Sequence, residues 1–317
     1  MKHFFFYFFF FGIVAANGQT FTDPGAYNNA IVDEQTRITA RNLDYITTSV
    51  HSKNFQLIEN KRVEVIKQLQ TALSYTQSLP DYEGNTKLRD KAIEVLEIYL
   101  ETFKIDFNEA LILKQGSEAS YQAMEDYFNA QEKAEKKLDA ANDTFLQAQQ
   151  DFAKAFNMQI VEAEGNADNK LAVIGELNEY TRKIYLEQFR VSKINAAYVE
   201  ALNTDDLERM KSKGKELQSA TKASLEILET LKPFKGDAGY LNAALKLVNF
   251  YDELAQEDYP TVNEILSRKD NLTKEDVDTI NKVIGKLNNG SGALIDKLNA
   301  ENEALLKKHI PAPGKRT

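Results

Sequence analysis

Residues 91–113, KAIEVLEIYLETFKIDFNEALIL, indicate the fold class of this chain. Apolar side chains recur there at alternating spacings of four and three residues, which is typical of an α-helix packed lengthwise against its neighbours. The seam positions are Ala92, Leu96, Tyr99, Phe103, Asp106, Ala110 and Leu113. Similar stretches fill most of the sequence, Gly and Pro fall between them, and the alternation of a β-strand is nowhere evident. The sequence therefore predicts an all-α protein.

The second half of the chain resembles the first at a shift of 152 or 153 residues. The matching pairs at this shift include Tyr27 and Tyr180, Glu34 and Glu187, Tyr45 and Tyr198, Gly84 and Gly236, Tyr99 and Tyr251, and Asp106 and Asp258. A shift that stays constant over roughly 80 positions indicates a gene duplication with a unit of about 150 residues.

Each unit is expected to hold four long helices joined by short turns, which makes neighbouring helices antiparallel. The expected helices of the first unit are 27–51, 54–79, 86–115 and 117–156. In the second unit the first helix is 169–203, the second begins at Thr204, the third follows the turn at 232–236, and the fourth begins at Thr273 and is broken at 288–292. Asn54 and Ser117 are the expected N-caps in the first unit, and Thr273 with Asp276 resembles a capping box in the second. The prediction is two tandem, duplicated up-down four-helix bundles, residues 19–165 and 166–310, followed by a disordered tail at 311–317. Because the linker is short, end-to-end stacking of the bundles through a fused helix is one possible arrangement.

The first 18 residues have the layout of a secretory signal peptide. One cation precedes an apolar run at 4–15, and small residues follow near Ala16. A run of about 12 apolar residues is shorter than the ~20 needed to cross a bilayer, so a membrane anchor is the weaker alternative. We expect cleavage before Asn17 or Gln19 and export to the bacterial periplasm or cell surface, without an integral membrane span.

Composition excludes several classes of function. The net charge of −9 leaves no cation surplus for nucleic acid, and the absence of Cys excludes thiol catalysis and disulfide scaffolds. Only three His are present, and the sequence contains neither the Glu-x-x-His pairs of di-iron bundles nor a zinc helix or phosphate loop. We therefore predict no catalytic residue, no metal site and no cofactor.

Charged residues on the helix seams are the unusual feature. Glu34 and Glu187 occupy matching positions in the first helix of each unit, and Asp106 and Asp258 do so in the third; Arg62 lies on the seam of the second helix. Buried carboxylates are costly unless they are paired, so a structural role in fixing helix register is expected, with tyrosine hydroxyls or an arginine as partners. Arg62 is the expected partner of Asp106.

An alternative function for the same residues is ligand binding. Glu34, Asp106 and Arg62 in the first unit, and Glu187 and Asp258 in the second, would then line polar pockets for a cation or a small ligand. The position equivalent to Arg62 is Gly214, so the second unit must satisfy Asp258 in another way.

The opening of the expected mature chain resembles a known family. Residues 23–35, DPGAYNNAIVDEQ, are similar to the start of an uncharacterised family of exported helical proteins, described as surface proteins in Leptospira and found in Bacteroidetes. The resemblance implies an exported, surface-exposed helical protein, and it transfers no catalytic residue.

Together these observations favour a non-enzymatic protein that binds another envelope or extracellular protein. A periplasmic carrier of a small ligand is the second hypothesis. An enzyme would need two carboxylates facing one cleft, as in glycoside hydrolysis.

Overall fold

The computed structural model describes residues 1–317 except 1–20, 53, 161–166, 269–270, 311 and 313–317. Over the described residues the chain is all-α and forms no strand; two isolated β-bridges, Tyr82–Asn85 and Phe234–Asp237, close matching turns. The sequence prediction of an all-α protein is confirmed. The expected signal peptide at 1–18 and nearly all of the expected tail lie outside the described residues.

The first helices form an N-terminal group. They are α1 (Pro24–His51), α2 (Phe55–Ser78), α3 (Lys87–Glu101), the π-helical segment η1 (Thr102–Asp106), α4 (Phe107–Gly116), the 3-10 turn η2 (Ser117–Ala119) and α5 (Tyr121–Ala155). Asn54 caps α2 as predicted, because its side chain accepts the Leu57 N–H. The predicted cap Ser117 is wrong, since a 3-10 turn intervenes and Ser120 caps α5 instead.

The remaining helices form a C-terminal group. They are α6 (Ala167–Asn203), α7 (Leu207–Thr230), α8 (Gly239–Glu253), the π-helical segment η3 (Leu254–Asp258), α9 (Tyr259–Leu266) and α10 (Lys274–His309). Thr273 and Asp276 form the expected capping box of α10. The cap of α7 is Asp206 rather than Thr204.

The break expected at 288–292 does not occur. Helix α10 continues through these residues, and a Cβ added at Gly290 would stand 2.6 Å from the Phe250 ring. Glycine serves there to let α8 approach α10 closely, at a small cost in helix propensity. Gly and Pro therefore do not fall only between helices.

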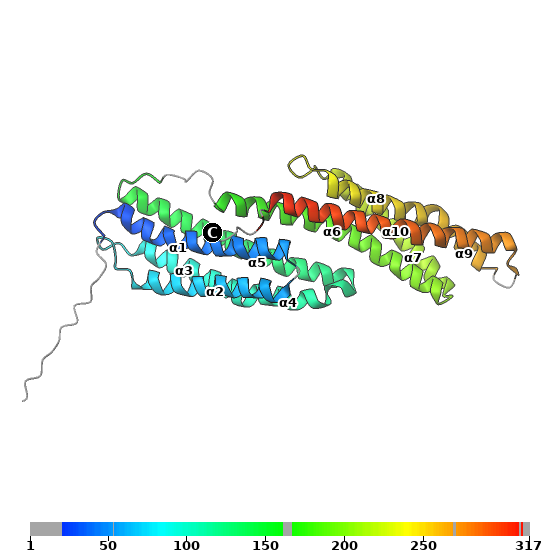
Figure 1. Ribbon diagram of the computed structural model, residues 1–317, viewed down its shortest axis with the longest axis horizontal. Coiled ribbons are helices and arrows are strands. Elements are labelled where there is room, and N and C mark those ends of the chain that lie inside the picture. Colours follow the sequence, from blue (N-terminus) through cyan, green and yellow to red (C-terminus); the bar gives the residue numbers. More distant parts are fainter. Residues whose placement is uncertain (1–20, 53, 161–166, 269–270, 311, 313–317) are drawn as a thin grey trace, which may run out of the picture.

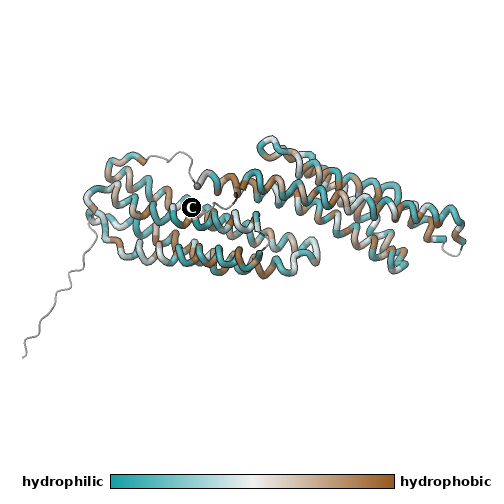
Figure 2. Tube along the Cα trace, in the orientation of Figure 1, coloured by the Kyte–Doolittle hydropathy of each residue, from teal (hydrophilic) through white to brown (hydrophobic). Residues whose placement is uncertain are grey.

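The two groups have differently organised cores. The N-terminal group has two clusters, one around Tyr27 and Phe152 and another around Leu69 and Phe103. In the C-terminal group one cluster runs from Ile174 to the end of α10. Apolar and polar residues alternate along the helices in Figure 2, as expected for helices with one buried face.

The groups overlap side by side, and they are not joined by a fused helix. Helix α5 ends at Ala155, α6 begins at Ala167, and α6 then packs against α5 and α1 (Figure 1). Arg182 of α6, whose side chain is only 10% exposed, pairs with Glu135 of α5 at 2.9 Å. The idea of end-to-end stacking through one shared helix is therefore wrong.

Among the described residues, none of the helices has the length and apolar character needed to cross a membrane.

Candidate functional site

The most distinctive backbone features are the two π-helical segments. η1 and η3 lie 152 residues apart, each in the middle of a long helical rod. The Phe107 N–H bonds to the Thr102 carbonyl, and the Tyr259 N–H bonds to the Leu254 carbonyl, five residues back in each case. Such segments insert one extra residue into an α-helix and are frequent at functional sites.

The extra residue displaces a carbonyl from the helical ladder, and a side chain of the second helix satisfies it. Arg62 Nη1 donates to the Phe103 carbonyl oxygen at 2.7 Å. Gln218 Nε2 donates to the Ala255 carbonyl oxygen at 2.7 Å. Pro260, five residues after Ala255, has no N–H to offer. Buried carbonyls need a partner, so α2 and α7 each supply one.

A lysine of the last long helix holds each π-helical segment from the other side. Lys137 Nζ lies 3.0 Å from Asp106 and 3.1 Å from Glu101. Lys286 Nζ lies 2.7 Å from both Asp258 and Glu253. The hydrogen bond from Lys137 to Asp106 raises the pKa of Lys137; burial lowers the pKa of Lys286, but its bonds to Asp258 and Glu253 outweigh this and raise it.

The expected pair between Arg62 and Asp106 is therefore wrong. Arg62 binds Glu59 at 2.7 Å and the Phe103 carbonyl, whereas Asp106 binds Lys137. Heptad counting assumes a regular helix, and the inserted residue turns later side chains by about 100° around the axis. Asp106 and Asp258 are consequently half-buried, with side chains 15% and 21% exposed, and they face the last helix.

Glu34 and Glu187 are buried and fully partnered. Glu34 pairs with Arg37 and accepts from Gln68 Nε2 at 3.1 Å. Glu187 pairs with Arg190 at 2.7 Å and accepts from Ser224 Oγ at 2.8 Å.

Each of these two acids is therefore joined to an arginine one turn along its own helix and to a polar group of the second helix, which suits the predicted structural role. The five predicted residues do not form one site. Arg62 lies at η1, but neither Glu34 nor Asp106 is among its hydrogen-bond partners; Glu187 and Asp258 likewise bind separate partners.

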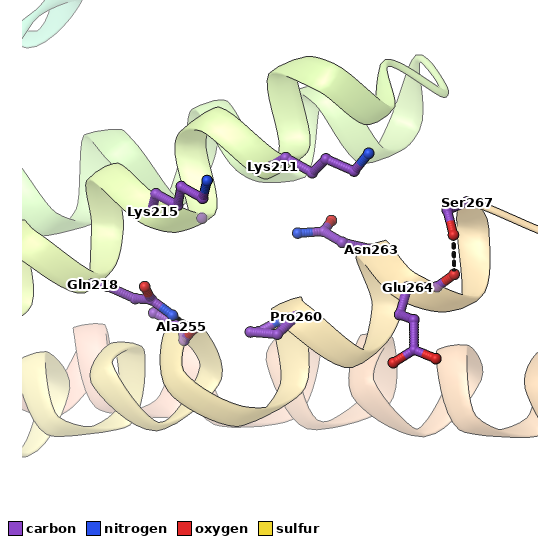
Figure 3. A pocket seen from close by; sticks show the side chains of 9 residues that line it. Lys211, Lys215, Gln218, Ala255, Pro260, Asn263, Glu264 and Ser267 are labelled. Atoms are coloured by element: carbon purple, nitrogen blue, oxygen red, sulfur yellow. Dashed lines mark hydrogen bonds between the residues drawn. The ribbon is translucent and has the colours of Figure 1, made fainter.

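A hollow of about 350 Å³ lies beside the second π-helical segment, between α7 and the stretch η3–α9 (Figure 3). Gly214 and Ala255, both small, lie on opposite sides of it. Figure 3 shows Asn263 and Pro260 reaching into the space beneath α7, while the Glu264 carboxylate points away. The lining residues are Lys211, Gly214, Lys215, Gln218, Ala255, Pro260, Asn263, Glu264 and Ser267.

Two stacked tyrosines support this hollow. The rings of Tyr198 and Tyr259 lie 3.6 Å apart and 8° from parallel, and burial raises the pKa of both hydroxyls. The Tyr198 hydroxyl donates to Asn263 Oδ1 at 3.1 Å. This bond fixes the amide so that Asn263 Nδ2 lies 3.7 Å from where a Cβ of Gly214 would stand. The hollow thus presents an amide donor in a set orientation.

The sequence contains two signals of this hollow that heptad spacing does not register. Pro260 lies inside the predicted third helix, and a proline there removes a helical hydrogen bond. Gly214 occupies the seam position of α7 that corresponds to Arg62 of α2, and it has no side chain to fill the space there.

A second hollow, of about 400 Å³, lies between α6 and α10 around Asn195 and Asn288. No group of three or more His, Cys, Asp or Glu within the described part of the chain is arranged to hold a metal ion.

Comparisons with protein-family models, curated proteins and solved structures find no match to this chain.

Proposed function

We propose that this chain is an exported, non-catalytic protein of two tandem, duplicated four-helix bundles, residues 19–165 and 166–310, that binds another envelope or extracellular protein. Support for the duplication is the recurrence, at a shift of 152, of the π-helical segment, the bridged turn and the lysine-held acid. The positive φ of Gly84 and of Gly236 recurs at the same shift.

One surface observation carries the binding role. Ile105 and Ile112 are 58% and 61% exposed and lie two helical turns apart on the rod formed by η1 and α4. The matching residues of the C-terminal group are Glu257 and Glu264. Large exposed aliphatic side chains on one group, with charges at the same places on the other, favour a contact surface at this place on the N-terminal group and not at the matching place on the C-terminal group.

Export to the periplasm or the cell surface rests on residues 1–18 and on the resemblance of residues 23–35 to the exported helical family. Mass spectrometry of protein purified from its own host should give a mature chain that begins at Asn17 or Gln19. Intact Met1 in that preparation would contradict export by signal cleavage.

The binding role is tested by photo-cross-linking on intact cells. A benzoylphenylalanine at position 112 should give one adduct of defined mass, and Ile105→Lys should abolish it. The matched control carries the cross-linker at Glu264 on the C-terminal group. The same adduct from position 264, or none from position 112, would contradict a partner on this surface.

The second candidate, a carrier with polar pockets around the seam acids, has less support. Both buried glutamates and both half-buried aspartates already have cationic or polar partners. None of these four acids lines the hollow at η3.

A further inference from the structure

The hollow beside η3 occupies the place that side chains fill in the N-terminal group. Arg62 corresponds to Gly214 at the shift of 152, and Phe103 corresponds to Ala255. In the N-terminal group the Arg62 guanidinium reaches the η1 backbone, and Phe103 is 2% exposed. Two large side chains are thus replaced by a hydrogen and a methyl group, and the hollow of about 350 Å³ is what they leave.

The charge at this place is also reversed. Glu59 pairs with Arg62 in the N-terminal group, and the residue at its corresponding position is Lys211. Lys215 lies one helical turn further along α7 and also lines the hollow. A position that holds a carboxylate in one group therefore offers an ammonium in the other.

Hydrogen-bond donors dominate the lining. Asn263 Nδ2 faces the hollow because Asn263 Oδ1 already accepts from Tyr198. Gln218 Nε2 is committed to the Ala255 carbonyl, and the Ser267 hydroxyl donates to the Glu264 carbonyl at 2.6 Å. The carboxylate of Glu264 points out of the hollow (Figure 3). Lys211 Nζ pairs with the exposed Glu208 at 3.1 Å, so a bound anion would have to replace that solvent-exposed partner. The ammonium groups of Lys211 and Lys215 and the oriented amide are together suited to an anion.

Size and the remaining lining limit the ligand further. Pro260 and Ala255 give the hollow an apolar wall, and about 350 Å³ is at the lower end of the range for small-molecule sites. We propose that the hollow between α7 and η3–α9 binds one small organic anion, with its carboxylate or phosphate group between Lys211, Lys215 and Asn263 and its short apolar body against Pro260. This inference rests on the residue correspondence between the groups and not on the proposed protein partner, so either can fail alone.

The test uses the mature chain, labelled with ¹⁵N at asparagine, titrated separately with citrate and with inorganic phosphate. The Asn263 side-chain amide signal, assigned from its loss in Asn263→Ser, should shift and saturate. Saturation by citrate alone would identify a carboxylate ligand, saturation by phosphate alone a phosphate ligand, and competition between them a shared anion site.

The decisive variant refills the hollow. Gly214→Arg restores the residue of the N-terminal group, and a Cβ at this position meets its neighbours at an ordinary 3.7 Å, so the variant should fold. It should abolish the saturable shift. Ser219→Arg, which adds the same charge at an exposed position of α7 outside the hollow, should leave the shift intact.

Removal of the two ammonium groups gives an independent check. Lys211→Ala with Lys215→Ala should weaken binding at least about tenfold, as expected for two lost charge-assisted bonds. The proposal is overturned if neither anion gives a saturable shift at Asn263, or if the shift persists unchanged in Gly214→Arg.

Discussion

The N-terminal and C-terminal groups contain the same backbone irregularity with different side chains around it. In both, a π-helical segment interrupts the third helical rod, and a lysine of the last helix binds two acids there. Arg62 satisfies the displaced carbonyl in one group and Gln218 in the other. Gln218 lies one turn further along its helix than the position that corresponds to Arg62.

This difference shows that the displaced backbone carbonyl needs a hydrogen-bond donor in both groups, whereas the residue that supplies the donor differs. A carbonyl removed from the ladder must find a donor, because an unsatisfied buried group costs about 1–3 kcal/mol. Any donor within reach is adequate, so the residue type and the helical turn are free to change. Because the donor of the C-terminal group lies at position 218, position 214 needs no side chain to satisfy the carbonyl.

The stacked tyrosines should show the largest difference between the groups. Tyr259→Ala removes a ring that is 1% exposed, and we expect a loss of about 3–5 kcal/mol in unfolding free energy. Phe107→Ala, at the corresponding and only half-buried position, should cost about 1–2 kcal/mol. Urea denaturation followed by circular dichroism measures both. Equal losses would show that the two rods are packed alike.

Removal of the carbonyl donors should have the next largest effect. Arg62→Met leaves both the Phe103 carbonyl and the Glu59 carboxylate without their partner, so we expect a loss of about 2–3 kcal/mol. Gln218→Met orphans only the Ala255 carbonyl and should cost about 1 kcal/mol. Hydrogen exchange of the amides in η1 and η3 should localise each effect to its own segment. Faster exchange in the other segment as well would contradict the expectation that each donor stabilises only its own π-helical segment.

The lysines should instead behave alike in the two groups. Lys137→Met and Lys286→Met each leave two acids without their cation, and each should cost about 1 kcal/mol. The exposed Lys133→Met, on the same helix as Lys137, is the control and should be neutral. A difference of more than about 1 kcal/mol between the two losses of unfolding free energy would mean that the two lysines contribute unequally to stability despite their similar geometry.

The smallest predicted effect is pH-dependent and specific to the N-terminal group. The hydrogen bond from Arg62 holds the pKa of Glu59 below its usual value of 4.5. The stabilisation that the ionised Glu59 carboxylate gives the folded state is therefore present above pH 4.5, and it is lost as the pH falls through the lowered pKa. Glu59→Gln should cost about 0.5 kcal/mol at pH 7, and this cost should shrink steadily as the pH falls below 4.5. A cost that stays the same throughout the acid titration would exclude charge as its origin.

Local signals in the sequence predicted some elements of this protein correctly, and long-range packing overrode others. The heptad seam of residues 91–113 predicted a long packed helix, and the turns around Gly84 and Gly236 predicted where α3 and α8 begin. Both kinds of signal are local. The pairing of Asp106 failed because one inserted residue rotates the seam, and periodicity alone does not register a π-helical insertion. The expected break at 288–292 failed because the glycine there serves a neighbouring helix.

The sequence by itself determined the all-α class, most helix limits and the matching positions of the two groups, since caps, turns and apolar spacing act within a few residues. The tertiary structure alone decided which side chains meet: Lys137 with Asp106, Arg62 with a carbonyl, and α6 beside α5. It also decided that Gly214 and Ala255 face each other across a hollow. Such contacts join residues far apart in the chain, and their geometry depends on how each helix is rotated about its axis, which local spacing does not specify.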